Sequence, residues 1–465
     1  MTTPVGVLAI GAAAPSLRLR GADVGAAWGG SGRGQIAVCG PDEDVLTLSW
    51  TAATDAIAAA GLEPADIDAL FWGTSRPPFA EGPSFAFLAG ALSLPATVGG
   101  VLTSGSAHAG MDALLAGWDA IAAGTARAVL VVAGDAVVPG LGTTFEGRAG
   151  AAAIALVLSN EGGSARLVAR STRTRPVLDR YRGDGERGLR DIYDGRLFRE
   201  EIYLPEVTAV AAALDGDATA WSLPDPDGRL AATAARRLGG TLASADTYTA
   251  LGDTGAAAAL LGATNALTAA GRAHVVAMGG GRTTAVALEV ADEVAGARAA
   301  QAVIAAPGRE ASYAEVLRVR GELVPSGETV AMAVPPGSAQ FVRGAEELLG
   351  LLGARCVDCG MISTPPSIHP VCVGCGGSKL EPTGLARSGS VHTFVVNHTM
   401  PAPFVAPLPL VVADLDDGAR IMLQGITEDA SALAIGDRVD LVLRKYAHER
   451  GVPVYGYKVK RLVAS

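Results

Sequence analysis

The sequence lacks any uninterrupted apolar run of about 18 residues, the length that a membrane-spanning helix needs. Its mean hydropathy of +0.32 is therefore assigned to buried strands and close-packed helices. Clusters of lysine and arginine are also missing, and together with a net charge of −10 this argues against a nucleic-acid partner. No basic segment precedes the apolar patch of MTTPVGVLAIGAAAPS, so we expect no secretory signal and a cytoplasmic location.

Aromatic residues make up only 5% of the chain and charged residues 18%, whereas glycine occurs 60 times and apolar residues reach 49%. This is the profile of a compact α/β protein rich in alanine, glycine and valine, and it excludes a disordered chain. A length of 465 residues exceeds what one core usually organises, so two or three packed units are expected.

Cysteine is scarce, with five in the chain, and four of these lie in CVDCGMISTPPSIHPVCVGC. Cys356 and Cys359 form one Cys-x-x-Cys knuckle, and Cys372 and Cys375 form a second. Two such knuckles complete the tetrahedral coordination of a structural zinc ion, whose closed site leaves no open position for a substrate. His369, between the knuckles, is expected to be a spectator, and Cys39 a small buried hydrophobe.

The first 295 residues alternate apolar runs with helical segments, which predicts duplicated βα layers with helices on both faces of the sheets. Strands are predicted at 69–73, 128–135, 153–159, 274–281 and 284–290, and helices at 44–62, 110–124, 227–240 and 254–271. The two similar halves span about 1–165 and 205–295. The polar segment 172–204 between them is either a solvated insertion or a lid over a substrate site.

The remaining chain is expected to hold a linker region at 296–343, a short helix with the zinc ribbon at 344–380, and a small all-β domain at 381–465. Strands predicted at 388–398, 408–418, 419–426, 437–446 and 454–462 suit a five-stranded barrel. The four-cysteine ribbon followed by SGSVHTFVVNH and a barrel resembles the rubredoxin-like zinc ribbon plus OB-fold family that accompanies acyl-CoA enzymes. This resemblance covers about 340–465 and implies acyl-CoA substrates and complexes with thiolase-type proteins.

Residues 1–295 resemble the thiolase superfamily, in particular its 3-hydroxy-3-methylglutaryl-CoA synthase and ketoacyl-synthase III branch. The resemblance is carried by DEDVLTLSWTAATDAIAAAGLEPADIDALFWGTSRPPF, GDTGAAAALLGATNAL and MGGGRTTAVALEV, in that order. It implies a coenzyme A thioester as substrate and a homodimer.

The sequence departs from this family at its catalytic positions. Where the family has Ala-Cys-x-Gly at the start of a buried helix, the chain reads Ala107-His108-Ala109-Gly110. The family's histidine context His-x-x-Asn-Gly-Arg reads Pro224-Asp225-Pro226-Asp227-Gly228-Arg229, its loop asparagine is Asp253, and the synthase glutamate is Ser75. A thiolate acyl-enzyme therefore cannot form at His108, and a serine acyl-enzyme at Ser106 has no identifiable base.

Two functions remain open. In the first, a neutral His108 at a helix N-terminus carries out acid–base catalysis of an aldol or retro-aldol step on an intact acyl-CoA. Asp253, Asp225 and Asp227 are then candidate partners, although Asp-Pro-Asp-Gly is also a good turn sequence. Ser106, Ser75 and Gly280 are expected to bind substrate, and a phenol is available from Tyr181, Tyr193 or Tyr203. In the second, the chain is a non-catalytic subunit that scaffolds a partner thiolase or channels acyl-CoA to it.

Overall fold

The computed structural model describes residues 5–30, 32, 34–192, 194–324, 326, 344–401, 404–449 and 452–462. The chain divides into two compact units. The first comprises Met1–Ala80 and Leu94–Val324, and the second comprises Glu81–Ser93 and Pro325–Ser465. Among the described residues, no helix is both long enough and apolar enough to cross a bilayer.

The first unit is built on a mixed sheet, to which ten strands contribute in the described part of the chain. Their order is β10-β9-β11-β12-β8-β1-β7-β6-β4-β5. The strands are β1 (Val5–Ala13), β4 (Ala69–Gly73), β5 (Gly99–Thr103), β6 (Ala128–Ala136), β7 (Ala151–Ser159), β8 (Ala165–Thr174), β9 (Ala220–Ser222), β10 (Thr241–Leu242), β11 (Gly271–Gly279) and β12 (Arg282–Val290).

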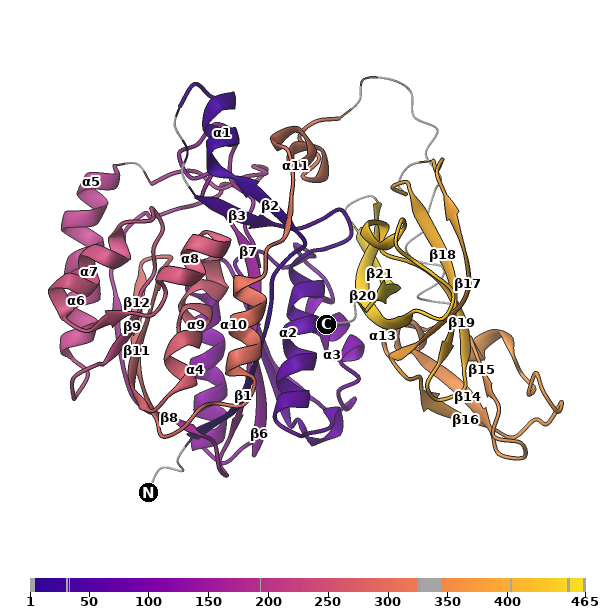
Figure 1. Ribbon diagram of the computed structural model, residues 1–465. Helices are drawn as coiled ribbons and strands as arrows, with labels where there is room; N and C mark the ends of the chain where they lie inside the picture. The colour runs from indigo at the N-terminus through magenta and orange to yellow at the C-terminus, as the bar shows by residue number, and fades with distance from the viewer. Residues whose placement is uncertain are drawn as a thin grey trace. The chain divides into compact units, whose positions relative to one another are not determined.

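Helices cover both halves of this sheet and also lie between them (Figure 1). Helix α2 (Val45–Ala59) packs on β1, β6 and β7 from outside, and α6 (Leu204–Ala212) packs on β8 and β12 from the other side. The middle layer holds α4 (Ala109–Ala122), α9 (Ala258–Gly262) and α10 (Ala297–Ala305). This α-β-α-β-α layering confirms the predicted thiolase-like α/β class.

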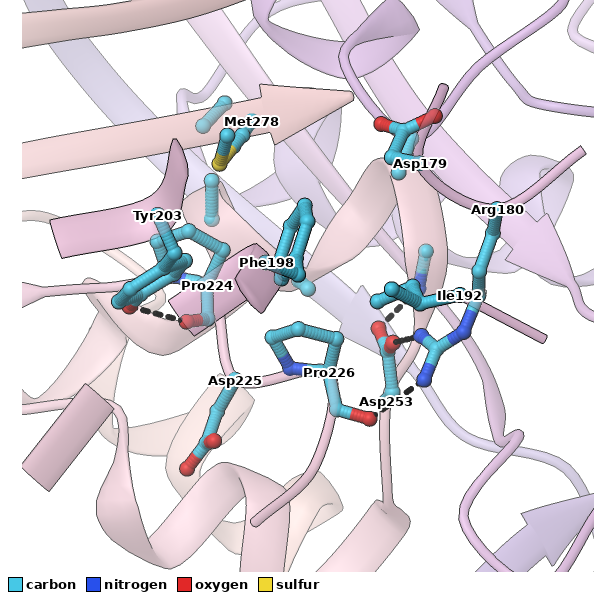
Figure 2. Close-up of a pocket in the computed structure, with 15 residues that line it drawn as sticks. Asp179, Arg180, Ile192, Phe198, Tyr203, Pro224, Asp225, Pro226, Asp253 and Met278 are labelled. Carbon is cyan, nitrogen blue, oxygen red and sulfur yellow. Dashed lines mark hydrogen bonds and ion pairs between the residues drawn. The ribbon is translucent and has the colours of Figure 1, made fainter. Parts of the chain in front are cut away.

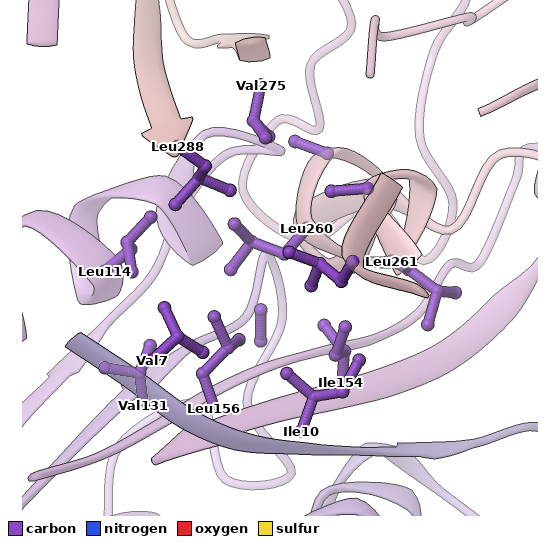
Figure 3. Close-up of a cluster of buried hydrophobic side chains, with 14 of the residues drawn as sticks. Val7, Ile10, Leu114, Val131, Ile154, Leu156, Leu260, Leu261, Val275 and Leu288 are labelled. Carbon is purple, nitrogen blue, oxygen red and sulfur yellow. The ribbon is translucent and has the colours of Figure 1, made fainter. Parts of the chain in front are cut away.

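The core of the first unit lies around the middle layer. Buried aliphatic side chains from the central strands and from α4 and α9 pack against one another (Figure 3). Val7, Ile154 and Leu156 come from the sheet, whereas Leu114 and Leu260 come from the two helices. Strand β7 is buried along its whole length, which explains its continuous apolar run AAAIALVLS.

Smaller elements complete the first unit. A three-stranded sheet contains β13 (Arg309–Glu310), β2 (Leu17–Arg20) and β3 (Gln35–Val38). The remaining helices are α1 (Gly21–Ala27), α5 (Gly195–Leu197), α7 (Leu230–Leu238), α8 (Ala245–Leu251) and α11 (Tyr313–Val319), with 3-10 turns η1 (Pro64–Asp66), η3 (Gly255–Ala257) and η4 (Thr264–Thr268) and the π-helical turn η2 (Phe198–Tyr203).

Two sequence expectations differ from the structure here. The helix predicted at 254–271 is broken into η3, α9 and η4, and Gly255 at its start adopts φ +55°, which a regular helix does not allow. The region assigned to a linker, 296–343, contains α10 and α11 up to Val319 within the first unit. Residues 327–343 of that region, including VPPGSAQ at 334–340, lie outside the described residues.

The second unit combines a small ribbon with a barrel. The ribbon sheet has the order β15-β14-β16 and consists of β14 (Leu352–Cys356), β15 (Ile362–Ser363) and β16 (Leu380–Gly384), with the turn η5 (Pro366–Ile368). The barrel strands are β17 (Ser388–Asn397), β18 (Leu408–Leu415), β19 (Arg420–Gln424), β20 (Arg438–Glu449) and β21 (Val452–Arg461), with η6 (Thr427–Asp429).

The barrel strands follow the order β19-β18-β17-β20-β21, and a bridge between Gly425 and Val459 joins the two edges. The expected OB-fold barrel is thus confirmed. Two short helices belong to this unit, α13 (Ala345–Leu349) and α3 (Ser84–Ala91). Helix α3 comes from the segment 81–93, which the sequence analysis had included in the first domain.

Candidate active site and metal centre

Two adjoining cavities lie beside the start of helix α4. Both are lined by Ala107, Asp179, Arg180, Asp253 and Gly255. The larger one, here called the polar cavity, has a volume of about 950 Å³ including space open to solvent. It is lined in addition by Ser75, Arg76, Ser106, Asp135, Arg182 and Gly280, among others. The smaller one, here called the apolar cavity, has a volume of about 570 Å³ including space open to solvent, and its walls are mainly hydrophobic. The N-terminus of helix α4, which carries the positive end of the helix dipole, begins directly after Ala107, a residue that lines both cavities.

Close backbone contacts position the start of helix α4. A Cβ atom on Gly110 would lie 2.0 Å from the carbonyl oxygen of Ala256, so only glycine lets the helix meet the loop after Asp253. A Cβ atom on Gly279 would lie 2.8 Å from the backbone nitrogen of His108. These two glycines bring the end of β11, the 253–257 loop and the helix start together around the cavities.

His108 is the N-cap residue of α4 and is fully buried. Its Nε2 lies 2.9 Å from Oγ1 of Thr284 on β12, and its Nδ1 lies 3.1 Å from Oδ1 of Asp112 on the next turn of α4. The Nδ1 contact has the distance of an ion pair without the angle of a hydrogen bond. The lining of both cavities includes Ala107 and does not include His108. The imidazole therefore faces β12. It does not line the cavities, where the motif comparison had placed a catalytic side chain.

Asp112 holds the other side of this buried contact. Burial by itself would raise the pKa of Asp112, but the close approach of the His108 ring nitrogen and of the Arg282 guanidinium brings that pKa below its usual value. The carboxylate therefore stays ionised between an imidazole and a guanidinium. His108 is thus part of a packed polar contact between α4 and β12.

The three predicted substrate-binding residues all line the polar cavity. Ser106 accepts a hydrogen bond from the backbone N–H of His108 at 3.2 Å, and Gly280 donates its N–H to Asp179 at 2.8 Å. Ser75 directs both its hydroxyl and its backbone N–H to the carboxyl group of Asp135.

Asp135 is the functional candidate that the sequence analysis missed. It lies near the end of β6, is fully buried and lines the polar cavity. Its Oδ2 accepts the N–H of Ala256 at 3.0 Å. Burial raises the pKa of Asp135 to about 6, although the hydrogen bonds from Ser75 and Ala256 oppose this. The available signal was a single carboxylate that ends the otherwise apolar strand AVLVVAGD.

Asp253 lines both cavities, as expected of a site residue, but its carboxylate is engaged by the protein. Arg180 donates from Nη1 to Asp253 Oδ2 at 2.8 Å and from Nη2 to the carbonyl oxygen of Pro226 at 2.6 Å. The Arg180 guanidinium also lies 3.3 Å from the centre of the Phe145 ring. The ion pair is a fixed wall between the two cavities, and Figure 2 shows it at the edge of the apolar one.

The other two predicted aspartates serve helix α7. Asp227 Oδ1 accepts the N–H groups of Arg229 at 2.8 Å and of Leu230 at 2.9 Å, and this residue is absent from the lining of both cavities. Asp225 lines the apolar cavity, but its Oδ1 accepts the N–H of Leu230 at 3.1 Å. Burial and the neighbouring charge of Asp227 raise the pKa of Asp225 to about 7. Both carboxylates thus satisfy the first turn of α7.

The polar segment 172–204 contributes walls to both cavities. Tyr181 lines the polar cavity, and Tyr203 lines the apolar one and donates its hydroxyl to the carbonyl oxygen of Pro224 at 2.6 Å. Tyr193 lies outside the described residues. Of the two interpretations of this segment, the lining favours a part in the site over a solvated insertion.

Positive charge gathers around the polar cavity, from the polar segment and from the loop after β4. Arg76 and Arg182 line the polar cavity beside Arg180, and Arg76 donates to the carbonyl oxygen of Arg187 at 2.6 Å. Burial, followed by repulsion from Arg182 and Arg187, lowers the pKa of Arg76. Such crowding of guanidinium groups is suited to an anionic ligand.

The four clustered cysteines converge in the second unit. Their sulfur atoms all lie within 4.8 Å of one another, with Cys356 and Cys375 at 3.6 Å and Cys359 and Cys372 at 3.5 Å. Four thiolates at the corners of a tetrahedron around zinc, each about 2.3 Å from the metal, would lie about 3.8 Å apart. The donor set and spacing therefore fit one tetrahedral metal ion.

Comparison with known proteins assigns both parts of the chain. Residues 383–444 match the family described as ChsH2, C-terminal OB-fold domain. A DUF35 domain-containing scaffold protein of Methanothermobacter thermautotrophicus is 34% identical over 115 residues, which are 24% of this chain and 85% of that protein. The hydroxymethylglutaryl-CoA synthase of Pyrococcus horikoshii is 30% identical over 159 residues, which are 34% of this chain and 45% of that enzyme.

A solved structure of MvaS in complex with 3-hydroxy-3-methylglutaryl coenzyme A shares the fold, with a TM-score of 0.62 and 22% identity over 72% of this chain and 96% of that one. The chain belongs to the DUF35 domain-containing family through its OB-fold part, and it carries in addition a thiolase-like core homologous to hydroxymethylglutaryl-CoA synthases.

Proposed function

We propose that the chain binds an acyl-CoA thioester in the two joined cavities and makes or breaks a carbon–carbon bond beside its carbonyl group, without a covalent acyl-enzyme. The observation that carries this proposal is the buried Asp135 carboxyl group, which lines the cavity at the start of α4 and is contacted by Ser75. The homology to hydroxymethylglutaryl-CoA synthases supports the thioester as substrate. The alanine at 107 leaves the helix start without a nucleophile.

Ser75 and Asp135 form a pair that can move a proton. Ser75 lines the cavity and its hydroxyl contacts the Asp135 carboxyl group. A carboxyl group with a pKa of about 6 exchanges protons readily near neutral pH. The pair therefore takes the role that sequence comparison assigned to His108, and it stands where a synthase would carry its glutamate.

In the cleavage direction the substrate is a 3-hydroxyacyl-CoA. The hydroxyl group loses its proton to Asp135 by way of Ser75, the bond between the second and third carbons breaks, and a carbonyl product leaves. The bonding electrons pass into the thioester enolate, which then takes a proton at its second carbon. The positive end of the α4 dipole stabilises the enolate oxygen. The same groups serve the condensation direction in reverse.

The arginines of the polar cavity would hold the charged part of the ligand. Arg76 and Arg182 line the polar cavity, whereas Arg180 already forms an ion pair with Asp253. Guanidinium groups bind phosphate oxygens in pairs, so these side chains are suited to the phosphates of coenzyme A.

The decisive variant is Asp135→Asn, which keeps the shape of the side chain and removes its titration. We expect turnover of the matching acyl-CoA to fall at least about 100-fold, the usual contribution of a general base, with acyl-CoA affinity within a few-fold of wild type. In the cleavage direction the wild-type kcat/KM should rise as the pH increases through an apparent pKa near 6, because Asp135 must be ionised to accept the proton. The variant should not show this rise. Asp119→Asn, an exposed carboxylate on α4, is the matched control.

His108→Ala is measured beside it. Loss of turnover in His108→Ala, with Asp135→Asn unaffected and both proteins equally folded, would contradict the assignment of the proton to Asp135. It would return that role to the histidine.

A second function is favoured by one observation. The DUF35 relative is described as a scaffold protein, and a non-catalytic subunit would also lack a nucleophile at the start of α4. In this case the chain would scaffold a partner thiolase or pass acyl-CoA to it. Expression of the chain alone separates the two functions. Acyl-CoA binding by the purified chain in calorimetry supports the enzyme, whereas failure to bind any thioester, with a thiolase identified by mass spectrometry after co-purification, supports the scaffold.

Two further features complete the proposal. The four cysteines hold a structural zinc ion, because their donor atoms match its preferred ligands and spacing. The thiolase-like part forms a homodimer, as its family resemblance implies. The cytoplasmic location proposed for the chain rests on its sequence, in which no basic segment precedes the N-terminal apolar patch.

A further inference from the structure

We infer that the apolar cavity is the binding site for an extended hydrocarbon group of the substrate, so that the natural ligand carries an apolar chain or ring beside its reacting carbons. This inference deepens the proposed function and rests on it.

The walls of the apolar cavity are hydrophobic on several sides. Ile192 and Phe198 come from the polar segment, Pro224 and Pro226 from the loop before α7, and Met278 from the end of β11. Alanines at 107, 258, 259 and 277 line the rest and leave the space open. Figure 2 shows Phe198 at the centre of this group, with Met278 and Pro226 on opposite sides.

The hydroxyl and carboxylate groups of the apolar cavity already have partners in the protein. The Tyr203 hydroxyl donates to the carbonyl oxygen of Pro224, and the Asp225 carboxylate accepts the N–H of Leu230. Asp253 is held by Arg180, and Asp179 by the N–H of Gly280. The Nε atom of Arg180, at the junction with the polar cavity, is the exception among the described residues, since it has no hydrogen-bond partner. Elsewhere in the cavity a polar group of a ligand would lose its hydration without gaining a free partner, whereas a hydrocarbon group would lose nothing.

The position of the cavity sets which part of the ligand enters it. The apolar and polar cavities meet at Ala107, Asp179, Arg180, Asp253 and Gly255. The reacting carbons lie at this junction, near Ser75 and Asp135 in the polar cavity. The coenzyme A moiety lies on the arginine side, so the substituent on the other side of the reacting carbons enters the apolar cavity.

The test compares the affinities of acetyl-CoA, succinyl-CoA and octanoyl-CoA by calorimetry on the full chain. Each methylene group buried in an apolar site strengthens binding roughly fourfold, so we expect octanoyl-CoA to bind at least about tenfold more tightly than the other two. Ala258→Phe should fill the cavity and abolish this difference without weakening acetyl-CoA. Met278→Ala should enlarge the cavity and keep or increase the difference. Leu178→Ala, on an exposed side chain, is the control.

Equal affinity for the three thioesters, or equal weakening of all three in Ala258→Phe, would overturn the inference while leaving the proposed function standing. If no thioester binds, the proposed function fails, and the cavity is tested separately with octan-1-ol. If octan-1-ol then raises the melting temperature of the wild type but not of Ala258→Phe, the cavity is an apolar binding site whose ligand is not a thioester. If octan-1-ol raises the melting temperature of neither protein, the apolar binding site is overturned together with the proposed function.

Discussion

At the scale of single residues, His274 is a second buried histidine with a different environment from His108. It lies on β11 with 1% of its surface exposed, and the ring packs edge-on against Trp221 with centroids 4.8 Å apart. Neither ring nitrogen has a hydrogen-bond partner among the residues that the structure describes. Burial, followed by the charge of Arg272, lowers the pKa of His274 to about 4, while Asp217 opposes the shift.

This environment predicts acid sensitivity of the first unit. In the unfolded chain the pKa of a histidine is near 6.5. Between this pH and about 4, His274 is therefore protonated in the unfolded state and neutral in the folded state. Stability should therefore fall as the pH drops from about 6.5 toward 4, by about 2 kcal/mol at pH 5. Denaturant unfolding at pH 7.5 and 5.0 measures this loss. His274→Leu should be markedly less sensitive over the same range, and an identical pH dependence in both proteins would contradict the prediction.

At the scale of elements, the ribbon is too small to form a core of its own. Strand β15 has two residues, β14 and β16 have five each, and only two of the four cysteines are buried. A metal ion bound by the four cysteines would then supply much of the folding free energy of the ribbon.

We predict close to one zinc ion per chain in protein purified without chelator. Removal of the metal should greatly speed hydrogen exchange of 352–384, whereas the barrel strands 388–461 should keep their protection, because they have their own buried aliphatic side chains. Cys372→Ser should reproduce the effect. Substantially less than one ion per chain in fresh protein, or exchange rates unchanged by a chelator, would rule the zinc out.

At the scale of the whole molecule, the second unit is assembled from two segments far apart in the sequence. The Tyr457 hydroxyl on β21 lies 2.8 Å from the carbonyl oxygen of Leu349 and 3.2 Å from that of Ala91 at the end of α3. Arg387 also donates to the Ala91 carbonyl at 3.0 Å, and Phe87 packs edge-on against Tyr455. Helix α3 is therefore an integral part of this unit.

Tyr457→Phe should destabilise the second unit by about 1–3 kcal/mol, because it leaves a buried carbonyl group without its donor. Hydrogen exchange of 84–91 and 345–349 should accelerate together, and exchange in the sheet of the first unit should not change. If 84–91 kept its protection in this variant, the Tyr457 contact would not be what holds α3.

The sequence by itself determined the fold class, because apolar runs and helical periodicity report burial locally. Predicted strands at 69–73 and 128–135 correspond to β4 and β6, and the two Cys-x-x-Cys pairs come together as expected. Ser75, Ser106, Gly280 and Asp253, which the sequence suggests as site residues, all line the cavities, and their roles there stay predictions.

Only the tertiary structure decided which side chains face the cavities. A one-residue difference at the start of a helix turns a side chain by about 100°, so the motif could not distinguish Ala107, which lines both cavities, from His108, which contacts Thr284. Asp135 is brought to Ser75 by the pairing of β4 with β6, a contact between residues far apart in the chain. The assignment of 81–93 to the second unit likewise depends on long-range packing, which no local pattern encodes.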